Sequence, residues 1–190
     1  MYKDYIKRFI DCICSCFLII LISPLFLVIA AVIKFTSKGS VFYKQKRVGR
    51  KGAVFNCLKF RTMVQNADTI GAWYTSENDN RITYIGRILR KTSLDELPQI
   101  INILKGDMSF VGPRPNVIQQ LDDYTIEQIN QRNSLKPGLT GLAQVKGRSQ
   151  LNFEERLTYD LDYVKNCSFI LDVTIIVNTI LIILKKKNAW

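Results

Sequence analysis

The chain has 190 residues and a formal net charge of +11, and 47% of its residues are hydrophobic. This length supports one domain with a hydrophobic core, and the charge favours anionic partners such as nucleic acid, anionic lipid or phosphorylated small molecules. The absence of histidine excludes Ser-His-Asp and Cys-His nucleophile systems. None of the five cysteines forms a CxxC pair, so the sequence indicates no disulfide or zinc framework and fits a reducing cytoplasm.

Residues 12–33 form an uncharged and mostly apolar segment, close to the ~20 residues that a membrane-spanning helix needs. It is long and shows no small-residue cleavage site before a polar start, so a cleaved signal peptide is not expected. Ser23-Pro24 lies at its centre. Because proline removes the amide that would bond to the Ile20 carbonyl, a kink or break is expected, and the Ser23 hydroxyl could satisfy part of the freed backbone.

Basic residues flank this segment on both sides, so neither end prefers the far compartment. A helix that enters the bilayer, bends at Ser23-Pro24 and returns to the same face explains both the kink and the charges. A kinked helix that spans the bilayer is the alternative.

The middle of the chain predicts a hairpin, a loop and several helices. Residues 41–43 and 53–60 are rich in β-branched and aromatic residues and flank a glycine-containing turn, which predicts a β-hairpin. Residues 63–81 are polar and predict a loop. Helices are predicted over residues 94–105, with Gly106 as the stop, over residues 118–133, and over residues 152–164, with Asn152 near the cap.

A second apolar run, residues 173–184, precedes three lysines. At ~1.5 Å per residue it is too short to cross a bilayer. It is either a buried core helix or an interfacial helix with its lysines on anionic headgroups, and the lysines favour the interface. The chain therefore predicts an α-rich α+β fold with a re-entrant membrane helix in residues 1–36. Residues 37–190 would form a small cytosolic domain with a β-hairpin and interfacial amphipathic helices.

Asp95 and Glu96 are adjacent carboxylates at the start of the helix predicted over residues 94–105. Ser93 and Glu96 have capping-box spacing, so a purely structural role is one interpretation. The helical pattern places Asp95 almost opposite the apolar stripe and Glu96 at its edge, so the two acids could serve separate roles. Basic neighbours are expected to keep Asp95 ionised, which suits a nucleophile or a metal ligand. Arg114, held between two prolines, is suited to binding a phosphate.

Short motifs follow one another along nearly the whole chain. They include Ser23-Pro24, Phe42-Tyr43-Lys44-Gln45, Lys59-Phe60-Arg61-Thr62-Met63, the stretch over residues 89–115, Pro137-Gly138-Leu139-Thr140-Gly141 and Gly147-Arg148. In this order they resemble the bacterial sugar transferase family, the monotopic phosphoglycosyl transferases. One departure is Arg132-Asn133, where the family often has Arg-His.

The resemblance implies a membrane enzyme that transfers a sugar-1-phosphate from a UDP-sugar to undecaprenyl phosphate and releases UMP, which initiates a surface glycan. It implies that Asp95 forms a covalent phosphosugar intermediate, that Mg²⁺ lies against Asp95, and that Glu96 positions the metal or handles a proton. It also implies that cationic side chains surround the phosphates or the nucleotide: Arg90, Arg114, Arg148 and, as a weaker candidate, Lys59. Ser-Pro marks a re-entrant helix in this family, which implies a monotopic protein on the cytoplasmic face of the bacterial inner membrane.

The basic charge also suggests a membrane-tethered nucleic-acid-binding protein. The chain lacks aromatic-basic interleaving and a recognisable reading helix, so no nucleic acid partner is expected. A processive glycosyltransferase would need a paired-aspartate metal motif after a strand, and none is apparent. The expected partners are therefore a UDP-sugar, polyprenol phosphate and membrane lipid, and a homodimer stays open.

Overall fold

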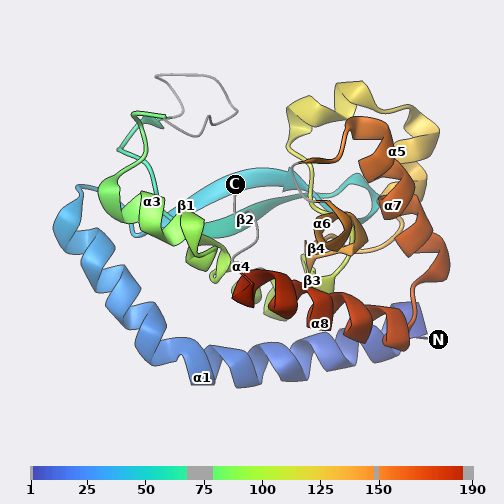
Figure 1. The fold of residues 1–190 in the computed structure, drawn as a ribbon, viewed down its shortest axis with the longest axis horizontal. Helices are drawn as coiled ribbons and strands as arrows, with labels where there is room; N and C mark the ends of the chain where they lie inside the picture. The colour runs from blue at the N-terminus through green and yellow to red at the C-terminus, as the bar shows by residue number, and fades with distance from the viewer. Residues whose placement is uncertain (1, 68–78, 148–149, 186–190) are drawn as a thin grey trace.

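The computed structural model describes residues 2–67, 79–147 and 150–185. One long helix, α1 (Lys7–Thr36), runs along one side of the molecule, and the other elements lie on its concave side (Figure 1). A π-helical turn, Tyr2–Ile6, leads into it. Together they form 35 helical residues, Tyr2–Thr36, the one helix in the described ranges that is long and apolar enough to cross a membrane.

Helix α1 stays helical through Pro24 and bends about midway along its length (Figure 1). The Ser23 hydroxyl donates a 2.8 Å hydrogen bond to the Ile20 carbonyl, the group that loses its backbone partner to Pro24. The predicted bend and its hydroxyl compensation are therefore confirmed, although the helix does not break. The re-entrant path through a bilayer stays a prediction.

Two short sheets lie above α1. Strands β1 (Phe42–Val48) and β2 (Val54–Phe60) form the predicted antiparallel hairpin. Val48 and Val54 are the paired residues next to its turn. Its turn places Lys51 in the left-handed region, with a φ of 55°. Strands β3 (Ser109–Val111) and β4 (Gly138–Thr140) pair in parallel. The α-rich α+β class is thus confirmed.

Six shorter helices complete the described fold, and one hydrophobic cluster ties it to α1. In that cluster Ile29 and Ile33 of α1 pack with Phe60 of β2 and with Leu89. The helices are α3 (Tyr84–Lys91), α4 (Gln99–Lys105), α5 (Ile126–Arg132), α6 (Leu142–Lys146), α7 (Phe153–Asn166) and α8 (Phe169–Leu184).

Two of the predicted helices are shorter than expected. The helix predicted over residues 94–105 begins only at Gln99, because Pro98 occupies its N-cap, and Gly106 ends it as expected with a φ of 95°. The helix predicted over residues 118–133 divides into a 3₁₀ segment and α5, because Thr125 starts a new helix through its own capping box.

The remaining local predictions agree with the structure where it describes them. The helix predicted over residues 152–164 is α7, which Asn152 caps through a box with Glu155. Most of the loop predicted over residues 63–81 falls outside the described residues, and at its edges Met63 and Ile82 form an isolated antiparallel bridge.

The N-terminal end of α1 is fastened to α7 and α8 by buried polar groups. Lys7 forms an ion pair with Asp172 of α8, and the Tyr2 hydroxyl donates to the same carboxylate. The Tyr163 hydroxyl of α7 lies 2.7 Å from the other oxygen of Asp172. These four residues are called the junction cluster below.

Helix α8 buries Asp172 and Ile175 but leaves most of its apolar side chains exposed. The alternative of a buried core helix is therefore wrong, whereas contact with a membrane surface stays a prediction.

Candidate active site

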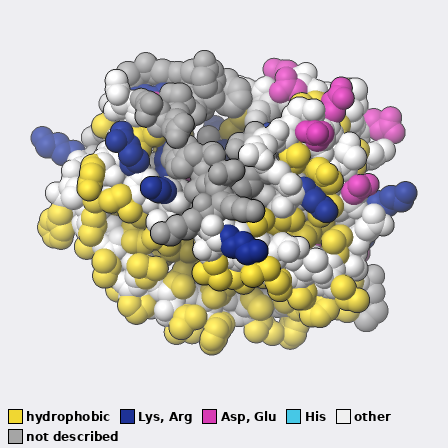
Figure 2. Space-filling model, viewed as in Figure 1, with side chains coloured by type: hydrophobic (Ala, Val, Ile, Leu, Met, Phe, Trp, Pro, Cys, Tyr) yellow, Lys and Arg dark blue, Asp and Glu magenta, His cyan; other side chains and the backbone are white. Residues whose placement is uncertain are grey.

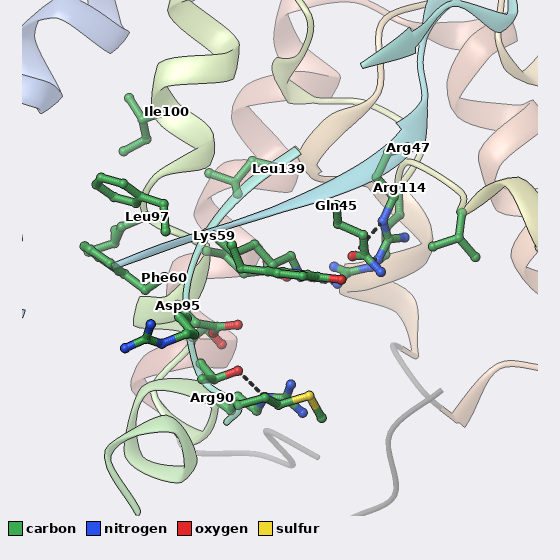
Figure 3. A pocket seen from close by; sticks show the side chains of 18 of the residues that line it. Gln45, Arg47, Lys59, Phe60, Arg90, Asp95, Leu97, Ile100, Arg114 and Leu139 are labelled. Carbon is green, nitrogen blue, oxygen red and sulfur yellow. Dashed lines mark hydrogen bonds and ion pairs between the residues drawn. The ribbon is translucent and has the colours of Figure 1, made fainter. Parts of the chain in front are cut away.

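A cavity of about 1580 Å³ opens beside the hairpin and collects most of the predicted site residues (Figure 3). Lys59 comes from β2, Arg90 from α3, and Asp95 and Glu96 from the turn before α4. Arg114 reaches it from the loop after β3. Arg148 lies outside the described residues, and Ser23 and Pro24 lie on α1 away from the cavity lining.

A 3₁₀ turn, Leu94–Glu96, presents the two acids, not the first turn of an α-helix. Ser93 enters it in the left-handed region, with a φ of 58°, and its side chain makes no capping hydrogen bond. The capping box proposed for Ser93 and Glu96 is therefore wrong. Because the turn rotates Asp95 inward, this side chain is only 9% exposed, so its predicted position on the outer face is also wrong.

Glu96 binds two cations through one oxygen. Its Oε1 accepts hydrogen bonds from Lys59 Nζ at 3.1 Å and from Arg114 Nη2 at 2.9 Å. Burial alone would raise the pKa of Glu96, but the charges of Arg114 and Lys59 outweigh it and hold this pKa far below its usual range. Glu96 is therefore an anion that ties the hairpin to the Arg114 loop.

Asp95 differs from its neighbour in having no partner. Its carboxylate makes no hydrogen bond or ion pair with another described residue and lies on the cavity wall (Figure 3). Burial raises its pKa, the charge of Glu96 adds to this effect, and Lys59, Arg90 and Arg114 oppose it. Burial thus has the largest effect on this pKa, and the cations offset only part of it, so the prediction that they keep Asp95 ionised stays a prediction. A desolvated, unpaired carboxylate of raised basicity is a stronger nucleophile than a solvated one.

Hydrogen bonds to other parts of the protein fix the position of the cations around Asp95. Arg90 Nε donates to the Thr62 hydroxyl at 2.9 Å. Arg47 Nη1 donates to the Pro115 carbonyl at 2.7 Å, and burial lowers the pKa of Arg47 to about 10. These contacts fix both the guanidinium of Arg90 and the loop that carries Arg114.

A buried ion pair on the far side of this loop was not recognised from the sequence. Arg132 Nε donates to Asp160 at 2.8 Å, and Arg132 Nη2 donates to the Arg114 carbonyl at 2.6 Å. The side chains are 3% and 1% exposed. No short motif links residues from α5 and α7, so only the fold reveals the pair. The neighbouring Asn133 is buried and accepts a hydrogen bond from Lys51 N through its backbone carbonyl, a contact that does not depend on its side chain.

The side chains of the cavity can be compared with those that usually bind Mg²⁺. The described residues contain no group of three or more acidic, cysteine or histidine side chains that could hold a metal ion unaided. Mg²⁺ commonly keeps several waters and takes one or two carboxylates together with substrate phosphates. The unpaired carboxylate of Asp95 fits this mode, in which a diphosphate would supply further oxygens.

The model of one protein family, described as bacterial sugar transferase, matches residues 2–186. The chain belongs to this family. Over 97% of its length it is 40% identical to the exopolysaccharide production protein ExoY of Rhizobium meliloti and covers 88% of that protein. Over 98% of its length it is 39% identical to a UDP-glucose:undecaprenyl-phosphate glucose-1-phosphate transferase of Caulobacter vibrioides, of which it covers 73%.

A longer relative is the undecaprenyl-phosphate galactose phosphotransferase of Salmonella typhimurium. It is 39% identical over 98% of this chain, which covers 42% of it. The family and these relatives together identify the chain as a sugar-phosphate transferase.

Proposed function

We propose that this enzyme transfers a sugar-1-phosphate from a UDP-sugar to undecaprenyl phosphate, with release of UMP, as the first step of a surface glycan. The names of the relatives support the substrates. The observation that carries the mechanism is the unpaired, desolvated Asp95 carboxylate in a cavity whose other charged groups are mostly cations.

In the first half-reaction an Asp95 oxygen attacks the phosphorus that carries the sugar. The bond from this phosphorus to the oxygen of UMP breaks, and UMP leaves with the electron pair. In the second half-reaction an oxygen of undecaprenyl phosphate attacks the same phosphorus and Asp95 is regenerated. Dividing the transfer in this way means that a soluble donor and a membrane-bound acceptor need not be bound at once.

Around Asp95 the chain supplies positive charge. Lys59, Arg90 and Arg114 neutralise the diphosphate, and Arg148 is proposed to join them at the nucleotide. Glu96 keeps Lys59 and Arg114 in place. Mg²⁺, when bound at Asp95, would neutralise further phosphate charge and polarise the phosphorus.

The nucleophile can be identified by mass spectrometry of enzyme quenched after incubation with donor alone. A phosphosugar adduct is expected on Asp95 in the wild type, and the adduct and turnover should both be absent in Asp95→Asn. Asp162→Asn, a change at an exposed acid of α7, is the matched control and should behave as the wild type. An adduct on another residue, or near-normal turnover in Asp95→Asn, would refute the assignment.

The metal is tested by chelation. Activity should be lost in EDTA and return with added Mg²⁺, because the diphosphate donor must be neutralised at Asp95. Full activity in the chelator would show that the arginines and Lys59 neutralise the donor alone.

We further propose that α1 is re-entrant and that the catalytic domain lies on the cytoplasmic face. The support is the bend at Ser23-Pro24 together with the basic residues on both flanks. A cysteine at Lys3, in a background without native cysteines, should stay protected from a reagent added outside intact cells. Replacing Ser23 and Pro24 by alanine would straighten the helix and expose this cysteine at least partly. External labelling in the native segment would mean that α1 spans the membrane.

A further inference from the structure

The active-site cavity is lined by apolar side chains as well as by charged ones. The same continuous cavity is lined by Leu18 of α1 and by Ile176, Ile180 and Ile183 of α8. These four residues are called the apolar limb. The cavity thus presents branched aliphatic side chains as well as Asp95 and its cations.

Two hydroxyls near the apolar limb are already satisfied within the protein, whereas the side-chain amide of Gln144, which lines the same cavity from α6, has no hydrogen-bond partner among the described residues. The Thr140 and Thr179 hydroxyls lie 2.7 Å apart, and Thr179 Oγ1 lies 2.8 Å from the Ile175 carbonyl. Because these hydroxyls bond to the protein, the wall toward α8 offers mainly carbon to an occupant. It is a poor match for a sugar or a nucleotide.

The apolar limb lies between the two helices that expose the most hydrophobic surface. Helix α8 begins against the N-terminal end of α1, where the rings of Tyr2 and Phe169 are 6.3 Å apart and Asp172 binds Lys7. Hydrophobic side chains gather along the lower part of the molecule in Figure 2, the region in which Figure 1 places α1 and α8. A hydrocarbon chain that lies on this apolar surface would therefore be next to helices whose side chains also line the cavity.

We propose that the apolar limb receives the isoprenoid chain of the acceptor and directs its phosphate toward Asp95 and Arg114. This inference rests on the proposed transfer to a polyprenol phosphate. An occupant that fits the whole cavity carries an anionic group at one end and hydrocarbon at the other, which describes the acceptor and not the donor. Hydrocarbon in the limb also excludes water, and with it hydrolysis of the aspartyl phosphosugar.

Two neighbouring positions on α8 provide a matched test. Ile180 lines the limb and is 51% exposed, whereas Leu181 is 45% exposed and does not line it. Tryptophan at either position keeps the surface apolar, so vesicle binding should be equal for Ile180→Trp and Leu181→Trp. Only Ile180→Trp should narrow the limb.

The two half-reactions separate the possible outcomes. With donor alone, both variants should release the wild-type burst of UMP. With undecaprenyl phosphate added, Ile180→Trp should raise the acceptor KM about fivefold or more, the lower end of what overpacking an apolar site costs, while Leu181→Trp should match the wild type.

If both variants use the acceptor equally well, or if Ile180→Trp also slows the UMP burst, the apolar limb does not hold the isoprenoid chain. If the wild type itself shows no burst with donor alone, the covalent mechanism fails instead, so the two failures can be told apart.

Discussion

Two buried aspartates in this small protein, one on the cavity wall and one outside the cavity lining, have contrasting surroundings. Asp172, in the junction cluster, is met by Lys7, Tyr2 and Tyr163, and both of its oxygens have partners. Asp95, on the cavity wall, has no partner among the described residues and a raised pKa. A buried carboxylate normally acquires hydrogen bonds or an opposite charge, since its burial is otherwise costly.

The difference separates a stabilising role from a chemical one. The contacts of Asp172 connect α1, α7 and α8, so this carboxylate helps to fix α1 to the C-terminal helices. Desolvation at Asp95 is offset only in part by the nearby cations, which costs stability and leaves the carboxylate free to react. Opposite mutational patterns are therefore expected at the two positions.

The largest effect is expected for Asp95→Asn, which should lower turnover by about 10³-fold or more, as for other nucleophiles. Its stability should nevertheless rise at pH 7. Because the folded-state pKa is raised, the fold favours the neutral carboxyl, and asparagine supplies a neutral group at every pH. The stability gain should shrink as the pH falls through that pKa and the wild-type carboxyl becomes protonated. Thermal unfolding from pH 4 to 8 measures both trends, and a less stable variant at pH 7 would contradict them.

The converse result is expected for Asp172→Asn. Removing this charge leaves the Lys7 ammonium buried and unpaired, which should cost about 3 kcal/mol of stability. Since Asp172 lies outside the cavity lining, the fraction that stays folded should keep near-normal turnover below the unfolding transition. Chemical denaturation and activity per folded molecule test this together. A stable but inactive variant would show that the junction cluster acts on catalysis directly.

A smaller effect is expected at Arg132, which supports the cavity without lining it. Arg132→Lys cannot bind Asp160 and the Arg114 carbonyl at once, so the donor KM should rise about tenfold as Arg114 loses its support. Because an unpaired charge here could also unfold the chain, Arg132→Met with Asp160→Leu is the companion variant. An apolar pair of this kind often restores stability. If it restored the donor KM as well, the ion pair would serve the fold alone.

The sequence predicts a structural feature well when residues close by in the chain determine it. The hairpin, the Gly106 stop, the Asn152 cap and the Ser23 hydrogen bond each follow from residues within a few positions, and all are confirmed.

The geometry around Asp95 depends on Pro98 and on partners brought in by the fold. Helical periodicity alone therefore gave the wrong face for Asp95 and a wrong capping partner for Glu96. The link between Arg132 and Asp160 joins residues 28 positions apart, which no local pattern records.

The smallest expected effect concerns Lys59, which supports both members of the acidic pair. Its positive charge lowers the pKa of Asp95 and that of Glu96. In Lys59→Met the pKa of Asp95 should therefore rise further, and the acid limb of the UMP burst rate should move to higher pH than in the wild type. Glu96 should contribute little to this limb, because its pKa lies far below the range in which the enzyme is assayed. Lys105→Met, at an exposed residue outside the cavity, is the control and should leave the limb unchanged. A limb that stays in place in Lys59→Met would mean that the burst rate reports the ionisation of a group other than Asp95.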